Sequence, residues 1–238
     1  MPETVTIPRR FCGPANSANG GYACGVVAGL VGGPAECTLR APPPLDVALA
    51  VERGDDGKIQ LRQGGLLVAE GVAAVVEVDV PAPVNFTTAV AAARSYIGFE
   101  RHPFPSCFVC GPQRGEGDGL RIFPGAVPER RVVAAPWIPD ASLADADGTV
   151  RPEIVWSVLD CPSWFGASAF ERFEGSAMLG RMAAMVRARP CVGDRCVAIG
   201  WLLAHEDRKV HCGSALLSDG GGVLAQARAT WIKLARKS

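Results

Sequence analysis

One pattern of secondary structure occurs twice in this chain of 238 residues. In each copy, an apolar segment of helical length is followed by candidate strands and then by two strands joined at a glycine turn. The clearest match is between residues 58–77 and 210–233, whose turns contain Gly64, Gly65 and the glycines of 219–222. Glycine supplies the positive φ that tight hairpins require. The repeat therefore constrains the chain to fold as two related halves.

Each hairpin is preceded by two further candidate strands and one helix. The helices are expected at 19–30 and 152–166, and both are apolar nearly all round, which is typical of a helix enclosed by other elements. The additional strands are expected at 35–41, 45–53, 177–189 and 195–205.

A helix at 87–96 is expected to link the two copies. We place the boundary near residue 100, which gives an N-terminal half at 1–100 and a C-terminal half at 101–238. One buried helix with a long antiparallel sheet, present twice, predicts the α+β class.

Charge and composition exclude several classes of function. Lys plus Arg and Asp plus Glu both total 24, so a net charge of zero disfavours nucleic acid or an anionic membrane as a partner. No run approaches the roughly 18 apolar residues of a membrane span, and residues 1–10 lack an apolar signal-peptide core. The nine cysteines suit reduced core thiols better than a disulfide framework. We expect a soluble cytoplasmic protein, and the many Ala, Gly, Arg and Pro residues indicate a GC-rich bacterial genome.

Asp160 is a lone carboxylate in the otherwise apolar second helix. Aspartate is rarely buried unless another group pairs with it or the protein uses it. One explanation is local, because Asp160 could bond to backbone groups where Pro162 disrupts the helix. The other explanation is functional, and it is favoured because residues 19–30, the same helix in the first copy, lack the acid.

Three local features accompany the repeat. Residues 19–21, Asn-Gly-Gly, open the first helix, and prolines follow at 42–44 and at Pro190 in corresponding parts of the two sheets. Residues 107–120 contain a Cys-x-x-Cys-Gly turn followed by a Gly-Leu strand. Together with the order of elements, these features resemble the double-hotdog acyl-CoA thioesterases over most of the chain. The resemblance implies a tandem hotdog, in which two antiparallel sheets each wrap a central helix and pack as a pseudo-dimer, and it allows a homo-oligomer of such units.

The resemblance also implies a site at the start of the helix. In hotdog thioesterases a glycine N–H there polarises the thioester carbonyl, and an acid eight residues further on acts as base or nucleophile across the interface. A helix N-terminus suits an oxyanion because its N–H groups are unpaired and carry partial positive charge. Eight residues after Gly20 is Ala28, so the first copy has the donor without the acid. Eight residues before Asp160 is Pro152, so the second copy has the acid without an N–H.

These two defects are complementary if the halves pack together, and they predict one composite site. Our hypothesis is that Asp160 activates a water molecule, or attacks directly, at a carbonyl held by the N–H of Gly20 or Gly21. Asn19 would serve as N-cap or as an additional donor. We therefore expect an enzyme that hydrolyses an acyl thioester of coenzyme A or of a carrier protein, with no cofactor.

Two positions depart from the family pattern. Where related enzymes place a Ser or Thr on the strand after the helix, this chain has Gly180, and where double-hotdog enzymes use a Gln on the last strand, it has Ala229. Two alternatives therefore stay open. One is a non-catalytic protein of the same fold that binds acyl thioesters, and the other is a hotdog dehydratase or hydratase.

A basic pair, Arg208 and Lys209, lies in a polar connection between two expected strands. We predict that it contacts the phosphates of coenzyme A. The alternative is a solvated turn, because Glu206 and Asp207 directly precede the pair.

Cys107 and Cys110 have the spacing of a zinc knuckle. A four-ligand site needs two more partners, and the sequence contains no second Cys-x-x-Cys and no His pair. His102 and Cys12 would contribute only if the fold brought them close. We therefore expect a structural turn here and no metal site.

Overall fold

The computed structural model describes residues 3–173 and 176–234. Within these residues it contains one eleven-stranded antiparallel sheet and three α-helices, which confirms the predicted α+β class. The helices are α1 (Gly20–Val31), α2 (Phe86–Ala93) and α3 (Pro152–Ser168). The strands are β1 (Thr4–Thr6), β2 (Ala35–Leu39), β3 (Ala48–Arg53), β4 (Ile59–Gln63), β5 (Leu66–Ala73), β6 (Gly125–Val127), β7 (Val132–Trp137), β8 (Ala177–Val186), β9 (Cys196–Glu206), β10 (Lys209–Ser218) and β11 (Val223–Lys233).

The strand order shows the same plan in both halves of the chain. The sheet runs β1-β3-β4-β5-β2-β8-β11-β10-β9-β7-β6. In each half the strand that follows the helix, β2 or β8, lies at the centre, next to the last strand of the hairpin, β5 or β11. The hairpin turns include Gly64 and Gly221 with φ of 55° and 82°, which is the positive φ that the sequence predicted for them.

The two separate sheets predicted from the sequence are instead one continuous sheet. β2 and β8 pair antiparallel, with Ala35 opposite Ala184 and Thr38 opposite Arg181. Two separate sheets would each leave a row of unpaired N–H and C=O groups at this edge, and the pairing satisfies both rows. The sequence also did not predict β1, β6 and β7, which extend the outer edges.

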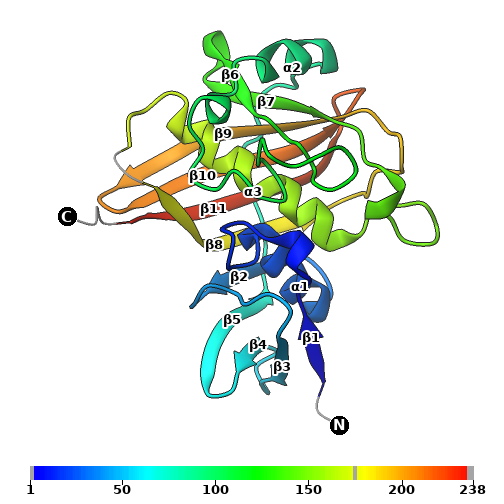
Figure 1. The fold of residues 1–238 in the computed structure, drawn as a ribbon, viewed down its shortest axis with the longest axis vertical. Coiled ribbons are helices and arrows are strands. Elements are labelled where there is room, and N and C mark those ends of the chain that lie inside the picture. The colour runs from blue at the N-terminus through cyan, green and yellow to red at the C-terminus, as the bar shows by residue number, and fades with distance from the viewer. Residues whose placement is uncertain (1–2, 174–175, 235–238) are drawn as a thin grey trace.

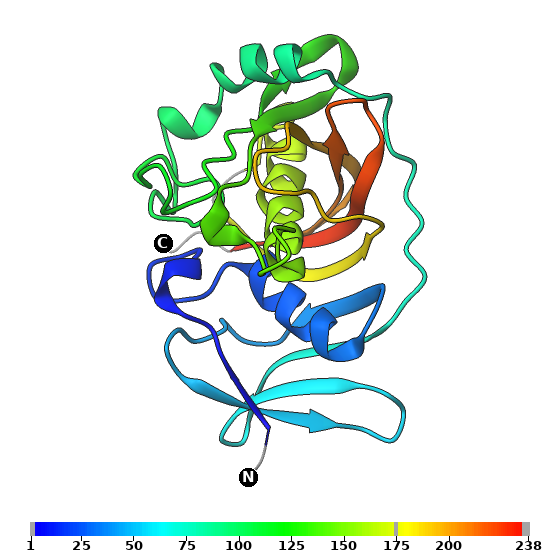
Figure 2. The same cartoon turned by 90° about the vertical axis from the view of Figure 1, so that its right-hand side faces the viewer.

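The connection between the halves is long and irregular. Residues 74–85 have no regular secondary structure and run along the molecule from β5 to α2 (Figure 2). The predicted linking helix at 87–96 is present as α2, and the domain boundary near residue 100 stays a prediction. None of the helices in the described ranges has the length and apolar character that a bilayer crossing requires.

α3 is the central helix of the C-terminal half. It lies across one face of β8–β11, and these strands curve around it (Figures 1 and 2). Close approach of helix and sheet depends on Gly166 and Gly200, because a β-carbon on Gly166 would collide with the backbone of Trp201 and one on Gly200 with the carbonyl of Pro162.

Pro162 lies inside α3 and does not end it. Two serine hydroxyls donate to carbonyls just before the proline: Ser163 Oγ to Asp160 O at 2.6 Å, and Ser214 Oγ to Leu159 O at 2.6 Å. Side-chain donors of this kind help a helix to continue past a proline. The local explanation for Asp160, a helix disrupted at Pro162, is therefore wrong.

α1 packs against α3 through two glycines. A β-carbon on Gly21 would lie 2.6 Å from Asp160 Cβ, and one on Gly25 would lie 2.6 Å from Glu153 Cα. The later glycine thus contacts the earlier part of α3, so the two helices run antiparallel. This packing brings the N-terminus of α1 directly against Asp160.

The glycine contacts predict a contrast between two substitutions in α1. Gly25→Ala should destabilise the protein by about 1–3 kcal/mol, because its β-carbon would push α1 away from Glu153. Gly29→Ala is the matched control, because a β-carbon there meets no atom within 4 Å. It should stabilise the protein by up to about 1 kcal/mol through helix propensity. Urea unfolding of both variants measures the difference, and equal free energies of unfolding would contradict the close packing.

Candidate active site

Asp160 is buried, with 2% of its surface exposed. Its Oδ2 accepts hydrogen bonds from Asn19 Nδ2 at 2.7 Å and from Gly21 N at 2.9 Å. Its Oδ1 has no hydrogen-bond partner among the described residues. Burial raises the pKa of Asp160 to about 7, although the two donors act in the opposite direction. Oδ2 of the carboxyl group is thus fixed by two hydrogen bonds, whereas Oδ1 has no hydrogen-bond partner in the described part of the chain.

Asn19 connects the start of α1 to this carboxyl group. Its Oδ1 accepts the Tyr22 N–H at 2.9 Å and so caps the helix, as predicted. Its Nδ2 donates to Asp160 Oδ2. The side chain therefore acts as cap and as donor at once, and its donor is directed at the acid.

The first N–H groups of α1 have different partners. The Gly21 N–H donates to Asp160, and the Tyr22 N–H donates to the Asn19 side chain. The Gly20 N–H forms no hydrogen bond within the part of the chain that the structure describes. Of the two glycines predicted as oxyanion donors, Gly21 therefore positions the acid, and Gly20 keeps a free donor.

These groups meet at a cavity of about 1230 Å³. Asn19, Gly20 and Asp160 form part of its wall. Much of the remaining wall is apolar, and it includes Leu39, Phe104, Trp164, Phe165, Leu179 and Trp231. A cavity of this size and character can bind a largely apolar small molecule.

The start of α3 has the same backbone geometry as the start of α1 but lacks the functional groups. The N-cap residues Asn19 and Arg151 have φ, ψ of −59°, 134° and −59°, 141°. Pro152 follows Arg151 and has no N–H, and Ala28 stands on α1 where an acid would be needed. The acid and the free donor therefore occur together at the start of α1.

Gly180 and Ala229, the two positions that depart from the family pattern, have no neighbouring polar side chain among the described residues that takes the place of the expected Ser, Thr or Gln. Gly180 lines the cavity without a side chain. Ala229 is buried between Met182 and Cys212 on the neighbouring strands. The nearby glutamine, Gln226, donates from Nε2 to Val76 O at 3.3 Å and is not part of the cavity wall.

Arg208 and Lys209 lie at the β9–β10 turn and do not line the cavity. Arg208 Nε donates to Lys233 O at 3.3 Å. Their predicted contact with coenzyme A phosphates stays a prediction. The cations that do line the cavity are Arg40, Arg101 and Arg172, which the sequence did not single out.

Three cysteine sulfurs lie beside the acid in the same cavity. The Sγ atoms of Cys107, Cys110 and Cys161 lie within 4.8 Å of one another, and Cys107 and Cys161 are 3.8 Å apart. Hydrogen bonds from the Cys110 and Cys161 side chains hold the pKa of Cys107 well below its usual value. His102 Nε2 lies 3.3 Å from Cys110 Sγ. The Cys-x-x-Cys turn is evident in the sequence, whereas Cys161 has no signal there except its position next to Asp160.

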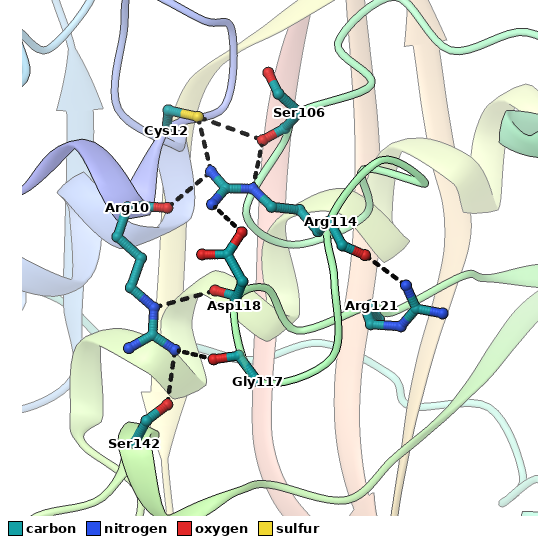
Figure 3. Close-up of polar contacts among 8 residues, drawn as sticks. All are labelled: Arg10, Cys12, Ser106, Arg114, Gly117, Asp118, Arg121 and Ser142. Carbon is teal, nitrogen blue, oxygen red and sulfur yellow. Dashed lines mark hydrogen bonds and ion pairs between the residues drawn. The ribbon is translucent and has the colours of Figure 1, made fainter.

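A network of arginines fixes the loop that carries Cys107 and Cys110 (Figure 3). Arg114 donates from Nε to Ser106 O at 2.8 Å and from Nη2 to Arg10 O at 2.9 Å. Its Nη1 pairs with Asp118 at 2.9 Å. Arg10 in turn donates to the carbonyl oxygens of Asp118 and Gly117. The loop is thereby attached to the segment that precedes α1.

Comparison with known proteins places the fold. No protein-family model matches the chain, and no curated protein matches it. Solved structures do match. A candidate thioesterase from Novosphingobium aromaticivorans superposes with a TM-score of 0.62 at 11% identity, covering 98% of this chain and 95% of that one. A candidate thioesterase II from Thermobifida fusca gives 0.61 at 14% identity, covering 98% and 92%. The tesB protein of Mycobacterium avium subsp. paratuberculosis gives 0.58 at 11% identity, covering 97% and 91%.

The chain has the fold of these three proteins. The resemblance to hotdog thioesterases drawn from the sequence is supported at the level of the fold.

The double role of Asn19 predicts an unequal pair of cap substitutions. Asn85 caps α2 in the same way, accepting the Thr88 N–H at 2.8 Å. Asn85→Ala should cost about 1 kcal/mol, the usual value of an N-cap. Asn19→Ala should cost about 1–3 kcal/mol more, because it also removes a donor from a buried carboxyl group. Chemical unfolding of both variants gives the comparison, and equal losses would show that the Asn19–Asp160 hydrogen bond contributes nothing to stability.

Proposed function

We propose that this chain hydrolyses an acyl thioester at a single site formed by the start of α1 and by Asp160. The observation that carries the proposal is which polar atoms have hydrogen-bond partners at this point and which do not. Asp160 Oδ2 is held by two donors, while the buried Asp160 Oδ1 and the Gly20 N–H have no partner among the described residues, and both residues line the same cavity. A free carboxylate oxygen beside a free helix N–H is the arrangement that acyl transfer needs.

The reaction begins when the thioester carbonyl oxygen accepts a hydrogen bond from the Gly20 N–H. Attack on the carbonyl carbon places negative charge on that oxygen, and the N–H and the positive end of α1 stabilise it. Asp160 Oδ1 takes a proton from the attacking water molecule and returns it to the departing thiolate. In the direct variant Asp160 attacks the carbonyl carbon itself, and water then hydrolyses the mixed anhydride.

Asn19 and Gly21 act through Asp160. Their hydrogen bonds to Oδ2 fix the carboxyl group and leave Oδ1 as the oxygen available for proton transfer. A group held in advance loses little entropy when the substrate binds. Glycine is required at position 21 for a second reason, because a β-carbon there would displace Asp160.

The substrate class follows from the cavity wall. Apolar side chains such as Trp164, Leu179 and Trp231 suit an acyl chain. Arg101 and Arg172 are exposed, line the cavity and can contact the phosphates of coenzyme A or of a carrier's prosthetic group. The structural similarity to proteins described as thioesterases is consistent with this reaction.

We propose further that the chain is a tandem hotdog, that its two halves pack as a pseudo-dimer, and that one of the two possible sites works. It is supported by the matching strand order of the halves and by the antiparallel contact of α1 with α3. The second helix start, at Pro152, would be inactive for lack of an N–H.

Asp160→Asn tests the role of the acid. The amide oxygen of Asn can still accept from Asn19 and Gly21, so the fold should be retained, but the side chain can no longer take a proton. We expect the turnover of acyl-CoA to fall by about 10²–10⁴-fold. The assay should separate free coenzyme A from acyl-CoA by chromatography, because thiol reagents would also react with the nine cysteines. The panel should run from acetyl to long-chain and aromatic acyl groups.

Asp219→Asn is the control for the loss of a negative charge, because Asp219 is exposed and pairs with Arg195. It should leave turnover unchanged. An Asp160→Asn variant as active as the parent would overturn the mechanism. A parent protein that binds acyl-CoA without releasing thiol would favour the binding protein, and hydration of enoyl-CoA without thiol release would favour the hydratase.

Gly20→Pro tests the proposed oxyanion donor. Proline is well tolerated at the first position of a helix, and Asn19 already has the extended backbone that precedes a proline. The substitution therefore removes the N–H and imitates the natural start of α3 at Pro152. Gly20→Ala is the matched variant, since its β-carbon also meets Leu179 but its N–H remains. We expect turnover of Gly20→Pro to lie about 10²-fold below that of Gly20→Ala. Equal turnover in the two variants would exclude the Gly20 N–H as a donor to the transition state.

A further inference from the structure

Three thiols from two distant segments meet in the wall of the cavity. Cys107 and Cys110 belong to the loop after α2, and Cys161 belongs to α3. We propose that these three cysteines bind one Zn²⁺ ion through their sulfur atoms. The proposal revises the expectation of a purely structural turn, and it does not depend on the hydrolysis proposed above.

The distances fit a tetrahedral zinc site. Zinc–sulfur bonds of about 2.3 Å at tetrahedral angles place sulfur atoms about 3.8 Å apart. Cys107 Sγ and Cys161 Sγ are 3.8 Å apart, and all three sulfurs lie within 4.8 Å of one another. Small side-chain rotations therefore complete the site without movement of the backbone.

The cluster differs from an ordinary contact between buried thiols. Cys24 and Cys37 are such a pair of neighbouring buried thiols elsewhere in the core. The cavity cluster has a third sulfur from a separate element, and all three residues line the cavity. An ion can therefore reach them from solvent, which is a condition for any metal site.

The turn from Cys107 to Gly111 is tightly closed. The Gly111 N–H donates to Cys107 O at 2.9 Å and closes the turn, and a β-carbon on Gly111 would lie 2.5 Å from Cys107 N. The turn therefore holds Cys107 in one backbone conformation, beside the sulfur atoms of Cys110 and Cys161.

This turn is also fixed in place without a metal. Arg114 attaches the loop to the segment before α1 (Figure 3), and the Phe108 N–H donates to Cys12 O at 2.7 Å. Cys12 is occupied by this arrangement, because its Sγ contacts Ser106 O and Arg114 Nη2. Cys12 therefore does not serve as the fourth ligand.

His102 supports the cluster but does not complete it. The Phe104 N–H donates to His102 Nδ1 at 2.9 Å, so the neutral ring carries its proton on Nε2. That proton points to Cys110 Sγ, 3.3 Å away, and stabilises a thiolate there. The fourth position on the ion is left to a water molecule or to a group that enters the cavity.

Metal content and cobalt spectroscopy test the site. The full chain should be purified under reducing conditions without a histidine tag and then analysed for zinc by mass spectrometry. We expect one zinc per chain after incubation with ZnCl₂ and gel filtration. Replacement by Co²⁺ should give thiolate-to-cobalt charge transfer and the intense visible bands of tetrahedral cobalt. Cys107→Ser and Cys161→Ser should each lower zinc affinity by more than about 100-fold in a chelator competition.

Cys212→Ser is the matched control, because Cys212 is a buried cysteine of β10 outside the cluster. It should keep one zinc and the same cobalt spectrum. His102→Ala should weaken zinc binding by about 10-fold and keep the tetrahedral bands, because it removes a supporting donor.

Three results would overturn the proposal. The first is a folded parent protein that holds no zinc or cobalt above background. The second is a Cys107, Cys110 and Cys161 triple variant that still holds one ion. The third is a Cys107–Cys161 disulfide in protein alkylated during cell lysis, which would make the cluster a redox pair. The parent's cobalt spectrum decides the matter even if a cysteine variant fails to fold.

Discussion

The site depends on one buried contact, in which Asp160 Oδ2 accepts hydrogen bonds from the start of α1. The acid lies on a helix of the C-terminal half, and both donors, Asn19 Nδ2 and Gly21 N, lie at the start of a helix of the N-terminal half. A buried carboxyl group is costly unless such donors are present. The contact therefore ties the two halves together at the point where the chemistry is proposed. It requires glycine at position 21, because any side chain there would displace the acid.

The repeat explains why there is one such point and not two. The two helix starts have nearly the same N-cap backbone, so the fold alone does not distinguish them. Residue identity does, because Gly20 keeps an N–H that Pro152 lacks, and Asp160 is an acid where α1 has Ala28. Both starts can begin a helix, since proline is favourable at the first helical position. The asymmetry thus costs little stability, and under the proposed mechanism it leaves the start of α3 without the N–H donor that the start of α1 has.

Much of this arrangement could be predicted from the sequence, where a local signal existed. Asn19 before two glycines marks a helix start, and the glycines near 64 and 221 mark hairpin turns. Other features had no local signal. The pairing of β2 with β8 joins two edges whose residues look like any other strand. Which N–H anchors Asp160 and which stays free depends on the spacing of the two helices, and residue types do not encode it.

Cys161 is another residue whose contacts could not be predicted from the local sequence. It also connects the two proposed roles of α3, which are to carry the acid and to carry a zinc ligand. Its contact with Cys107 joins residues from different elements, so the Cys-x-x-Cys turn alone looked incomplete. Asp160 and Cys161 are neighbours on α3, and both line the cavity. Any ion held by Cys161 would therefore lie near the proposed site of hydrolysis, and its charge would act on the groups of that site. Because α1 fixes the acid and the Arg114 network fixes the cysteine loop, α3 is the element on which both constraints meet.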